Sequence, residues 1–141
     1  MQIYGESVLI ISSSPVPGGK ANSGMLCEAF ARGARECGHA VEIVALRDRQ
    51  INFCPECQFC VQKGEGYIRK SSGKKAHFIA MSAGADTEQN HLAANESFRG
   101  FLRCLRTVEE GGVLNAGGAY APGSNAGKDW LNKAYEMEKT E

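Results

Sequence analysis

The sequence predicts an open, doubly wound α/β sheet in a single domain that spans residues 1–141. Short apolar runs rich in β-branched residues alternate with amphipathic helical patterns along the chain. Three of these runs end in loops rich in glycine or serine. Regular alternation of strands and helices is typical of a parallel sheet that helices cover on both faces, and 141 residues are enough for one hydrophobic core.

The first half of the chain is expected to form a β–α–β unit. A strand covers Val8 to Ile11, and an amphipathic helix runs from Ser23 to Cys37. Gly38 follows this helix and suits the left-handed C′ position. A second strand covers Ala40 to Leu46. Two strands joined by one helix pair in parallel through a right-handed crossover.

The second half repeats the alternation. A strand is predicted from Ala76 to Met81, a long helix from Glu88 to Arg106, a strand from Gly112 to Ala116 and a final helix from Lys128 to Lys139. His91 falls on the polar side of the long helix and has no assigned role. The apolar stripe of that helix is predicted from Phe98, Phe101, Leu102 and Leu105.

The loop after the first strand has the chemistry of a phosphate site. Its hydroxyl, amide and ammonium donors precede a helix N-terminus, where backbone N–H groups hold anions. The Walker P-loop pattern does not fit, because Ser14 stands where its first glycine is needed and Ala21 follows Lys20 in place of Ser or Thr. An ordinary βα connection that binds nothing is the alternative. The candidate donors are Ser12, Ser14, Lys20, Asn22 and Ser23.

Three loops should meet at one edge of the sheet. They span residues 12–22, 82–86 and 117–123, and each follows the carboxyl end of a strand. Ligands of open α/β sheets bind at that edge, so the convergence favours a ligand site. Tyr120 lies in the third loop and is a further candidate contact.

Composition excludes several kinds of partner. Lys plus Arg equals Asp plus Glu at 16 each, so no basic excess favours a nucleic acid or an anionic membrane. No apolar run approaches the roughly 20 residues of a membrane span. The N-terminus shows no signal peptide, which makes the cytoplasm the expected location.

Six cysteines require an explanation. Disulfides are not expected without export, and Cys27, Cys37 and Cys104 are predicted to be buried in helices. The other three, Cys54, Cys57 and Cys60, have the C-x2-C-x2-C spacing that can wrap one face of an iron–sulfur cube. Free thiols and a zinc site are the alternatives, and His77 is a poor fourth ligand because it falls within a buried strand.

Two of these motifs together resemble the flavodoxin-like NAD(P)H-dependent FMN reductases and iron–sulfur flavoproteins. They are the Ser12-Ser13-Ser14-Pro15 loop with Gly19-Lys20-Ala21-Asn22-Ser23, and the cysteine run Cys54 to Cys60; the C-terminal third of the chain also looks similar. The resemblance implies a three-layer α/β/α fold.

The resemblance also implies residue roles. Ser14, Asn22 and Ser23 would hold the FMN phosphate, with Pro15 shaping the turn. Val16 stands where many members have Arg, so charge neutralisation would fall to Lys20 and the helix dipole. The flavin ring would lie against Ser82, Ala83, Gly84 and Asp86.

One departure from the resemblance is large. A strand–helix unit that members carry between the cysteine loop and the strand at Ala76 is absent, which would open a gap in the sheet beside the first strand. Three explanations compete: the sequence omits a stretch, the protein is a truncated relative, or two chains exchange elements to complete a sheet.

The function expected from the resemblance is an FMN-binding oxidoreductase. It would pass electrons from NAD(P)H through flavin to a flavin, a quinone or an iron–sulfur acceptor, and the acceptor would be a small molecule or a redox protein. A [4Fe–4S] cluster on the cysteine run and a homodimer are further implications. The alternatives are a non-catalytic flavodoxin-like electron carrier and a degenerate relative without cofactor.

Overall fold

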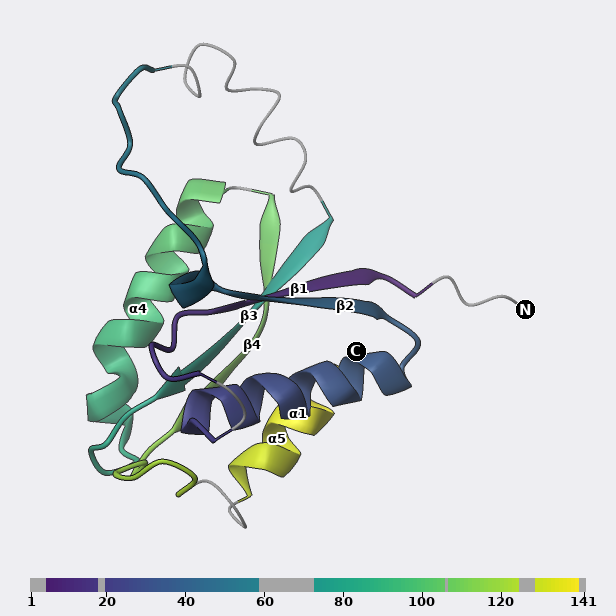
Figure 1. Cartoon of the computed structure of the whole chain (residues 1–141), viewed down its shortest axis with the longest axis vertical. Helices are drawn as coiled ribbons and strands as arrows, with labels where there is room; N and C mark the ends of the chain where they lie inside the picture. Colours follow the sequence, from purple (N-terminus) through teal and green to yellow (C-terminus); the bar gives the residue numbers. More distant parts are fainter. Residues whose placement is uncertain (1–4, 18–19, 59–72, 106, 125–128, 140–141) are drawn as a thin grey trace.

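The computed structural model describes residues 5–17, 20–58, 73–105, 107–124 and 129–139, and these form a mixed α/β structure (Figure 1). Parallel strands alternate with helices, as the sequence predicts. The elements are β1 (Ser7–Ser12), α1 (Asn22–Glu36), β2 (Ala40–Ala45), the 3₁₀ turn η1 (Leu46–Asp48), β3 (Lys74–Met81), α4 (Glu88–Leu105), β4 (Val108–Ala116) and α5 (Trp130–Glu136).

The strands form two separate two-stranded sheets. β1 pairs in parallel with β2, from Ser7 opposite Ala40 onward, and β3 pairs in parallel with β4. The prediction of one continuous doubly wound sheet is therefore wrong for the described residues. The physical reason is that no described strand hydrogen-bonds to a strand of both pairs, so nothing among the described residues joins them into one sheet.

Helix α1 forms where the periodicity places it. Its buried residues include Leu26, Ala29 and Phe30, which recur at helical spacing on one face. The helix ends in a Schellman motif, in which the N–H of Gly38 donates to Arg35 and the N–H of His39 donates to the carbonyl of Ala34. Gly38 has φ +89°, so the predicted C′ role is confirmed.

The core lies between α1, α5 and the strands. Figure 1 shows α1 and α5 on one side of the β3–β4 pair and α4 on the other. On the α4 side, Phe78 and Phe98 stack with ring centroids 4.9 Å apart. The buried cluster on the α1 side consists of Leu26, Ala29, Phe30, Leu114, Ala116 and Ala134.

Helices therefore cover both faces of the β3–β4 pair, whereas α1 covers only one face of the β1–β2 pair. Leu9 and Ile11 project from the face of β1 opposite α1 and are 58% and 61% exposed. This exposure is unusual for a parallel sheet, which normally has both faces covered. On α4, Phe101 is also 61% exposed, so its placement in the apolar stripe is wrong. Leu102, predicted in the same stripe, is buried, which confirms that part of the prediction.

Strand β4 begins four residues before the predicted start, because Val108 and Glu109 pair with Lys74 and Lys75. An irregularity in the ladder leaves Gly111 without a partner between the neighbouring pairs. A Cβ atom on Gly111 would lie 2.5 Å from the His77 ring. The absence of a side chain at position 111 therefore leaves room for the His77 imidazole in the interior.

Candidate phosphate site

A small pocket lies where β1 and β2 end, beside the first turns of α1. Its volume is about 110 Å³. Binding sites for whole cofactors usually enclose about 300–1,000 Å³, so this pocket fits one end of a ligand. It is lined by Ser12, Ser14, Val16, Gly24, Cys27, Glu28, Ile43, Ala45 and Arg47.

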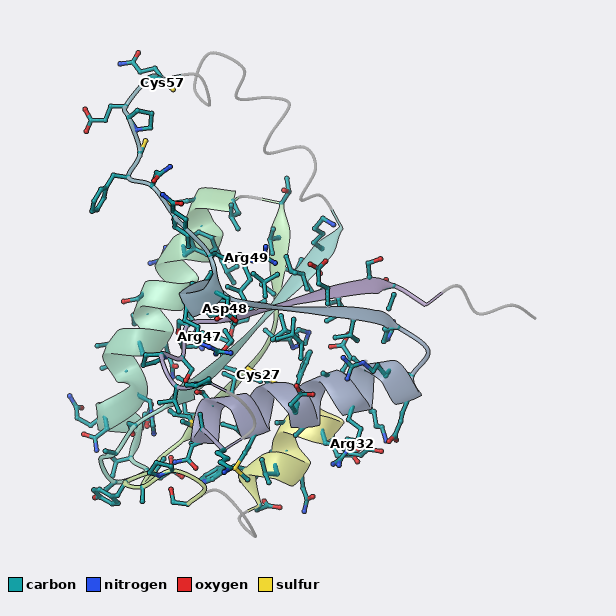
Figure 2. The ribbon with its side chains drawn as sticks, in the orientation of Figure 1. Cys27, Arg32, Arg47, Asp48, Arg49 and Cys57 are labelled. Carbon is teal, nitrogen blue, oxygen red and sulfur yellow. The ribbon has the colours of Figure 1, made fainter. Side chains whose placement is uncertain are left out.

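Arg47 brings a fixed positive charge to this pocket. It belongs to η1, directly after β2, and its guanidinium donates to the carbonyl of Val16 at 3.4 Å and pairs with Asp48 at 3.5 Å. Figure 2 shows Arg47 and Cys27 on the two elements that flank the pocket. Sequence reasoning missed Arg47, although a residue just beyond the carboxyl end of a strand adjacent to β1 is well placed for a ligand.

The serine loop and the helix terminus supply neutral donors. Ser12 is buried, and Ser14 lines the pocket while its hydroxyl oxygen accepts from the N–H of Val16 at 3.3 Å. The N-cap residue of α1 is Ala21, which has no side-chain oxygen to cap the first turn. As at the N-terminus of any helix, the backbone N–H groups of Ser23 and Gly24 have no intrahelical acceptor and are available to an anion.

Two other charged side chains come from the segments that form the pocket. Lys20 is exposed just before α1. Glu28 lines the pocket and pairs with Arg35 at 4.0 Å on the outer side of α1. Arg47 is thus the positive side chain that lines the pocket, and the Lys20 role expected from the sequence remains a prediction.

Cys27 forms part of the pocket wall one turn into α1. Burial raises the pKa of its thiol above the ordinary value of 9.0, although a hydrogen bond with Ser12 acts in the opposite direction. The thiol is therefore protonated at neutral pH and is a weak nucleophile. It contributes a small polarisable surface rather than a reactive group.

Asn22 joins the helix terminus to the loop after β4. Its side-chain nitrogen donates to the carbonyl of Ala121 at 2.7 Å and to the hydroxyl of Ser124 at 3.0 Å. Both amide hydrogens are therefore engaged in holding two loops together. In this arrangement Asn22 positions the site, and its expected contact with phosphate remains a prediction.

The loops after β3 and β4 are also joined. The N–H of Gly118 donates to Gly84 at 2.7 Å, and the N–H of Ala119 donates to Ser82 at 3.0 Å. A Cβ atom on Gly117 would lie 2.5 Å from the Cα of Asp86, so the loops pack closely only because this residue is glycine. With the Asn22 bonds, all three predicted loops meet at one edge.

Asp86 has a partner that the sequence did not suggest. Its carboxylate lies 3.1 Å from Nε2 of His91, which is buried in the first turns of α4. The placement of His91 on the polar side of the helix is therefore wrong. The pair fixes the loop of residues 82–86 to α4.

Several predicted contacts of the ring lie at the exposed surface. Ala83, Gly84 and Tyr120 are exposed, and Ser82 is half-buried with its hydroxyl 3.4 Å from the carbonyl of Gly84. Pro15 is exposed in the serine loop. These residues border the edge where the loops meet, and their roles toward a flavin remain predictions.

The cysteine run lies away from the pocket. Cys54 and Cys57 are exposed on an extended segment that leaves the body of the protein, and Cys60 falls outside the described residues (Figure 2). Within the described ranges no three metal-binding side chains come together. Cys104 is exposed, so its predicted burial in a helix is wrong, whereas Cys27 and Cys37 are half-buried.

A larger hollow of about 400 Å³ lies at the other end of the β3–β4 pair. It is lined by residues from the end of α4 and the start of β4, among them Arg99, Leu102 and Glu110. Arg99 already pairs with Glu110 and Glu96, each at 3.2 Å. Arg99 is held by two carboxylates, whereas Arg47 in the smaller pocket pairs with one, although Arg103 also lines the hollow. The hollow also lacks a helix N-terminus among its described lining residues, so it is a weaker anion site than the smaller pocket.

Comparison with known protein families, with curated proteins and with solved structures finds no match to this chain. Among the helices that the structure describes, none is both long enough and apolar enough to cross a membrane.

Proposed function

We propose that this chain binds FMN, with its phosphate in the pocket at the end of β1, and acts as an oxidoreductase that takes electrons from NAD(P)H. The observation that carries the proposal is the donor set around one small pocket: a serine hydroxyl, the Arg47 guanidinium and the N-terminus of α1. A helix N-terminus together with Arg favours a dianionic terminal phosphate.

The donor set fits the phosphate end of the cofactor. Many members of the similar family have an Arg where this chain has Val16. Arg47, which follows β2, would supply the corresponding positive charge, and its guanidinium donates to the Val16 carbonyl. The pocket is too small for a whole flavin, so the ring would extend over the joined loops at the same edge. FMN would supply the hydride acceptor and the redox chemistry.

The chain's own groups would bind and orient. Ser14, Arg47 and the α1 terminus would hold the phosphate, Asn22 would keep the α1 terminus against the loop after β4, and the Asp86–His91 pair would fix the loop after β3. No general acid or base is required of the protein. The acceptor would be a flavin, a quinone or an iron–sulfur partner, and a cluster on the cysteine run and a homodimer remain predictions.

A second candidate function is a binding module that takes a phosphate-bearing ligand without electron transfer. The observation that favours it is the division of the described strands into two pairs. A flavin ring usually rests against a continuous sheet edge, and the described strands do not form one.

The test is a titration of the protein with FMN, followed by flavin fluorescence, beside a titration with riboflavin, which lacks the phosphate. We expect FMN to bind and riboflavin to bind far more weakly. Arg47→Ala should weaken FMN binding roughly 10- to 100-fold, since a hydrogen bond to a charged group is worth about 1.5–3 kcal/mol. Arg49→Ala is the matched control, because Arg49 is exposed and does not line the pocket.

The outcomes separate the candidates. Bleaching of bound FMN by NADPH would support the oxidoreductase. FMN binding without bleaching would favour an electron carrier. If FMN and riboflavin bind equally, or neither binds, the phosphate-anchored flavin site is refuted; inorganic phosphate that still protects Cys27 from alkylation would then favour the second candidate.

A further inference from the structure

The hollow at the end of α4 differs in size and place from the smaller pocket beside α1. Its volume of about 400 Å³ falls within the range of about 300–1,000 Å³ that is usual for small-molecule sites. It lies at the amino ends of β3 and β4, whereas the three joined loops follow the carboxyl ends of the strands (Figure 1). A ligand in the hollow would therefore not compete with one in the smaller pocket.

The floor of the hollow is apolar. Leu102 is 8% exposed, Val108 is half-buried, and both side chains line the hollow. A ligand that covers this floor would remove the remaining apolar surface of both side chains from water, which is favourable only where the ligand surface is apolar too. The body of the ligand should therefore be apolar.

Arg99 forms one wall of the hollow, and its edges are occupied. Its Nε and Nη2 atoms donate to the two carboxylate oxygens of Glu110 at 3.2 and 3.3 Å, and Nη1 donates to Glu96 at 3.2 Å. These hydrogen bonds raise the pKa of the guanidinium above its ordinary value and fix its plane. Guanidinium faces stack on aromatic rings, so Arg99 favours a planar ligand.

Arg103 brings a second guanidinium to the hollow, one turn after Arg99 on α4. Its Nη2 atom lies 3.6 Å from the position that a Cβ atom on Gly100 would take, so the side chain folds back along the helix. Among the described residues, no carboxylate lies within ion-pair distance of Arg103, in contrast to Arg99. An unpaired guanidinium binds a carboxylate through two parallel hydrogen bonds, so Arg103 can anchor one carboxylate group.

The charges around the hollow balance one negative charge on a ligand. Lys74 is the register partner of Val108 and adds a third positive side chain to the two arginines. The two carboxylates bonded to Arg99 and the partial negative charge at the C-terminus of α4 oppose them. Lys75 and Glu109, which also pair in register, lie on the opposite face of the sheet. A single carboxylate is therefore matched here, and a polyanion is not.

We propose that this hollow binds a planar aromatic monocarboxylate. The carboxylate bonds Arg103, the ring stacks on the Arg99 guanidinium, and the edge of the ring covers the apolar floor. An aliphatic acid would cover the floor without stacking, and a neutral aromatic compound would leave Arg103 unpaired. The proposal goes beyond flavin binding and does not depend on it.

Binding is tested by isothermal titration calorimetry of the full chain with three probes. They are 2-naphthoate, the saturated acid decahydro-2-naphthoate, which has the same charge, and the neutral 2-naphthalenemethanol. We expect 2-naphthoate to bind saturably at one site per chain. Each of the other two probes should bind at least about tenfold more weakly, because the saturated acid cannot stack and the alcohol cannot form the charged hydrogen bonds.

Two variants locate the site. Arg103→Gln should weaken 2-naphthoate binding at least about tenfold while leaving the circular dichroism spectrum unchanged. Arg35→Gln is the matched control, because Arg35 is a last-turn arginine of α1 that does not line the hollow. Excess FMN should leave 2-naphthoate bound.

The proposal would be overturned by any one of four results. They are no saturable binding of 2-naphthoate, equally tight binding of either other probe, unchanged binding by Arg103→Gln, and displacement of 2-naphthoate by FMN.

Discussion

The contact between α1 and α5 depends on one glycine. Gly33 is buried on α1, and a Cβ atom built there would lie 2.0 Å from the carbonyl oxygen of Tyr135 and 3.0 Å from its carbon. Ordinary contact distances are about 3.5–4.0 Å between carbon atoms, so Gly33→Ala forces the α5 backbone to move by more than about 1 Å. The obstacle is backbone and has no rotamer to change.

The net effect follows from two opposing terms. Alanine is better than glycine in a helix by about 1 kcal/mol. Overpacking costs about 1–3 kcal/mol, and the upper end applies because α5 must shift as a unit and disturb the fully buried Ala134. We expect Gly33→Ala to lower the free energy of unfolding by about 2 kcal/mol, which corresponds to a fall in Tm of about 6 °C for a domain of this size.

The assay is urea unfolding followed by circular dichroism at pH 7. Gly100→Ala is the matched control on α4, because its new Cβ would meet only Arg103 Nη2 at 3.6 Å. That variant should be more stable than the parent by about 0.5–1 kcal/mol. If Gly33→Ala is as stable as Gly100→Ala, the packing of α5 on α1 described above is incorrect.

Three further predictions concern single side chains. Iodoacetamide should alkylate Cys27 far more slowly than the exposed Cys54, because burial raises the pKa of the Cys27 thiol. FMN should slow the alkylation of Cys27 and leave that of Cys54 unchanged. Equal alkylation rates, measured by peptide mass mapping, would contradict the pocket geometry. Hydrogen bonds from Tyr135 and then Lys139 lower the pKa of Glu36 below its ordinary 4.5. The stability that the Glu36 carboxylate adds is therefore present above pH 4.5 and is lost as the pH falls through the lowered pKa. Glu36→Gln should flatten the acid limb of a profile of unfolding free energy against pH. An unchanged acid limb would refute this. His91→Leu should lower the free energy of unfolding in urea by about 1–3 kcal/mol, because it removes the bond to the Asp86 carboxylate. A loss of less than about 0.5 kcal/mol would show that the bond is not formed.

Local patterns predicted much of this fold, and non-local contacts account for the rest. The α1 face and Gly38 follow from helical period and cap chemistry, which are encoded within a few residues. The early start of β4 does not, since Val108 and Glu109 become a strand by pairing with β3, more than thirty residues away.

The candidate site shows the same limit. The serine loop was visible as a motif, but Arg47 joins the pocket only because β2 folds beside β1. The buried His91 is paired with Asp86, a loop residue that a helical pattern does not include. The split into two strand pairs was expected only as the gap left by the strand–helix unit that the resemblance implies and the chain lacks; no local pattern specifies it.

The Asn22 bridge has a consequence for how the chain folds. Each strand pair with its helix is built from segments close in sequence, which form early because closing short loops costs little entropy. The bonds from Asn22 to Ala121 and Ser124 join residues about a hundred positions apart, as do the contacts of α1 with α5. Docking of the two halves is therefore expected to be the late step in folding, and amide hydrogens of both halves should then exchange together from the folded protein.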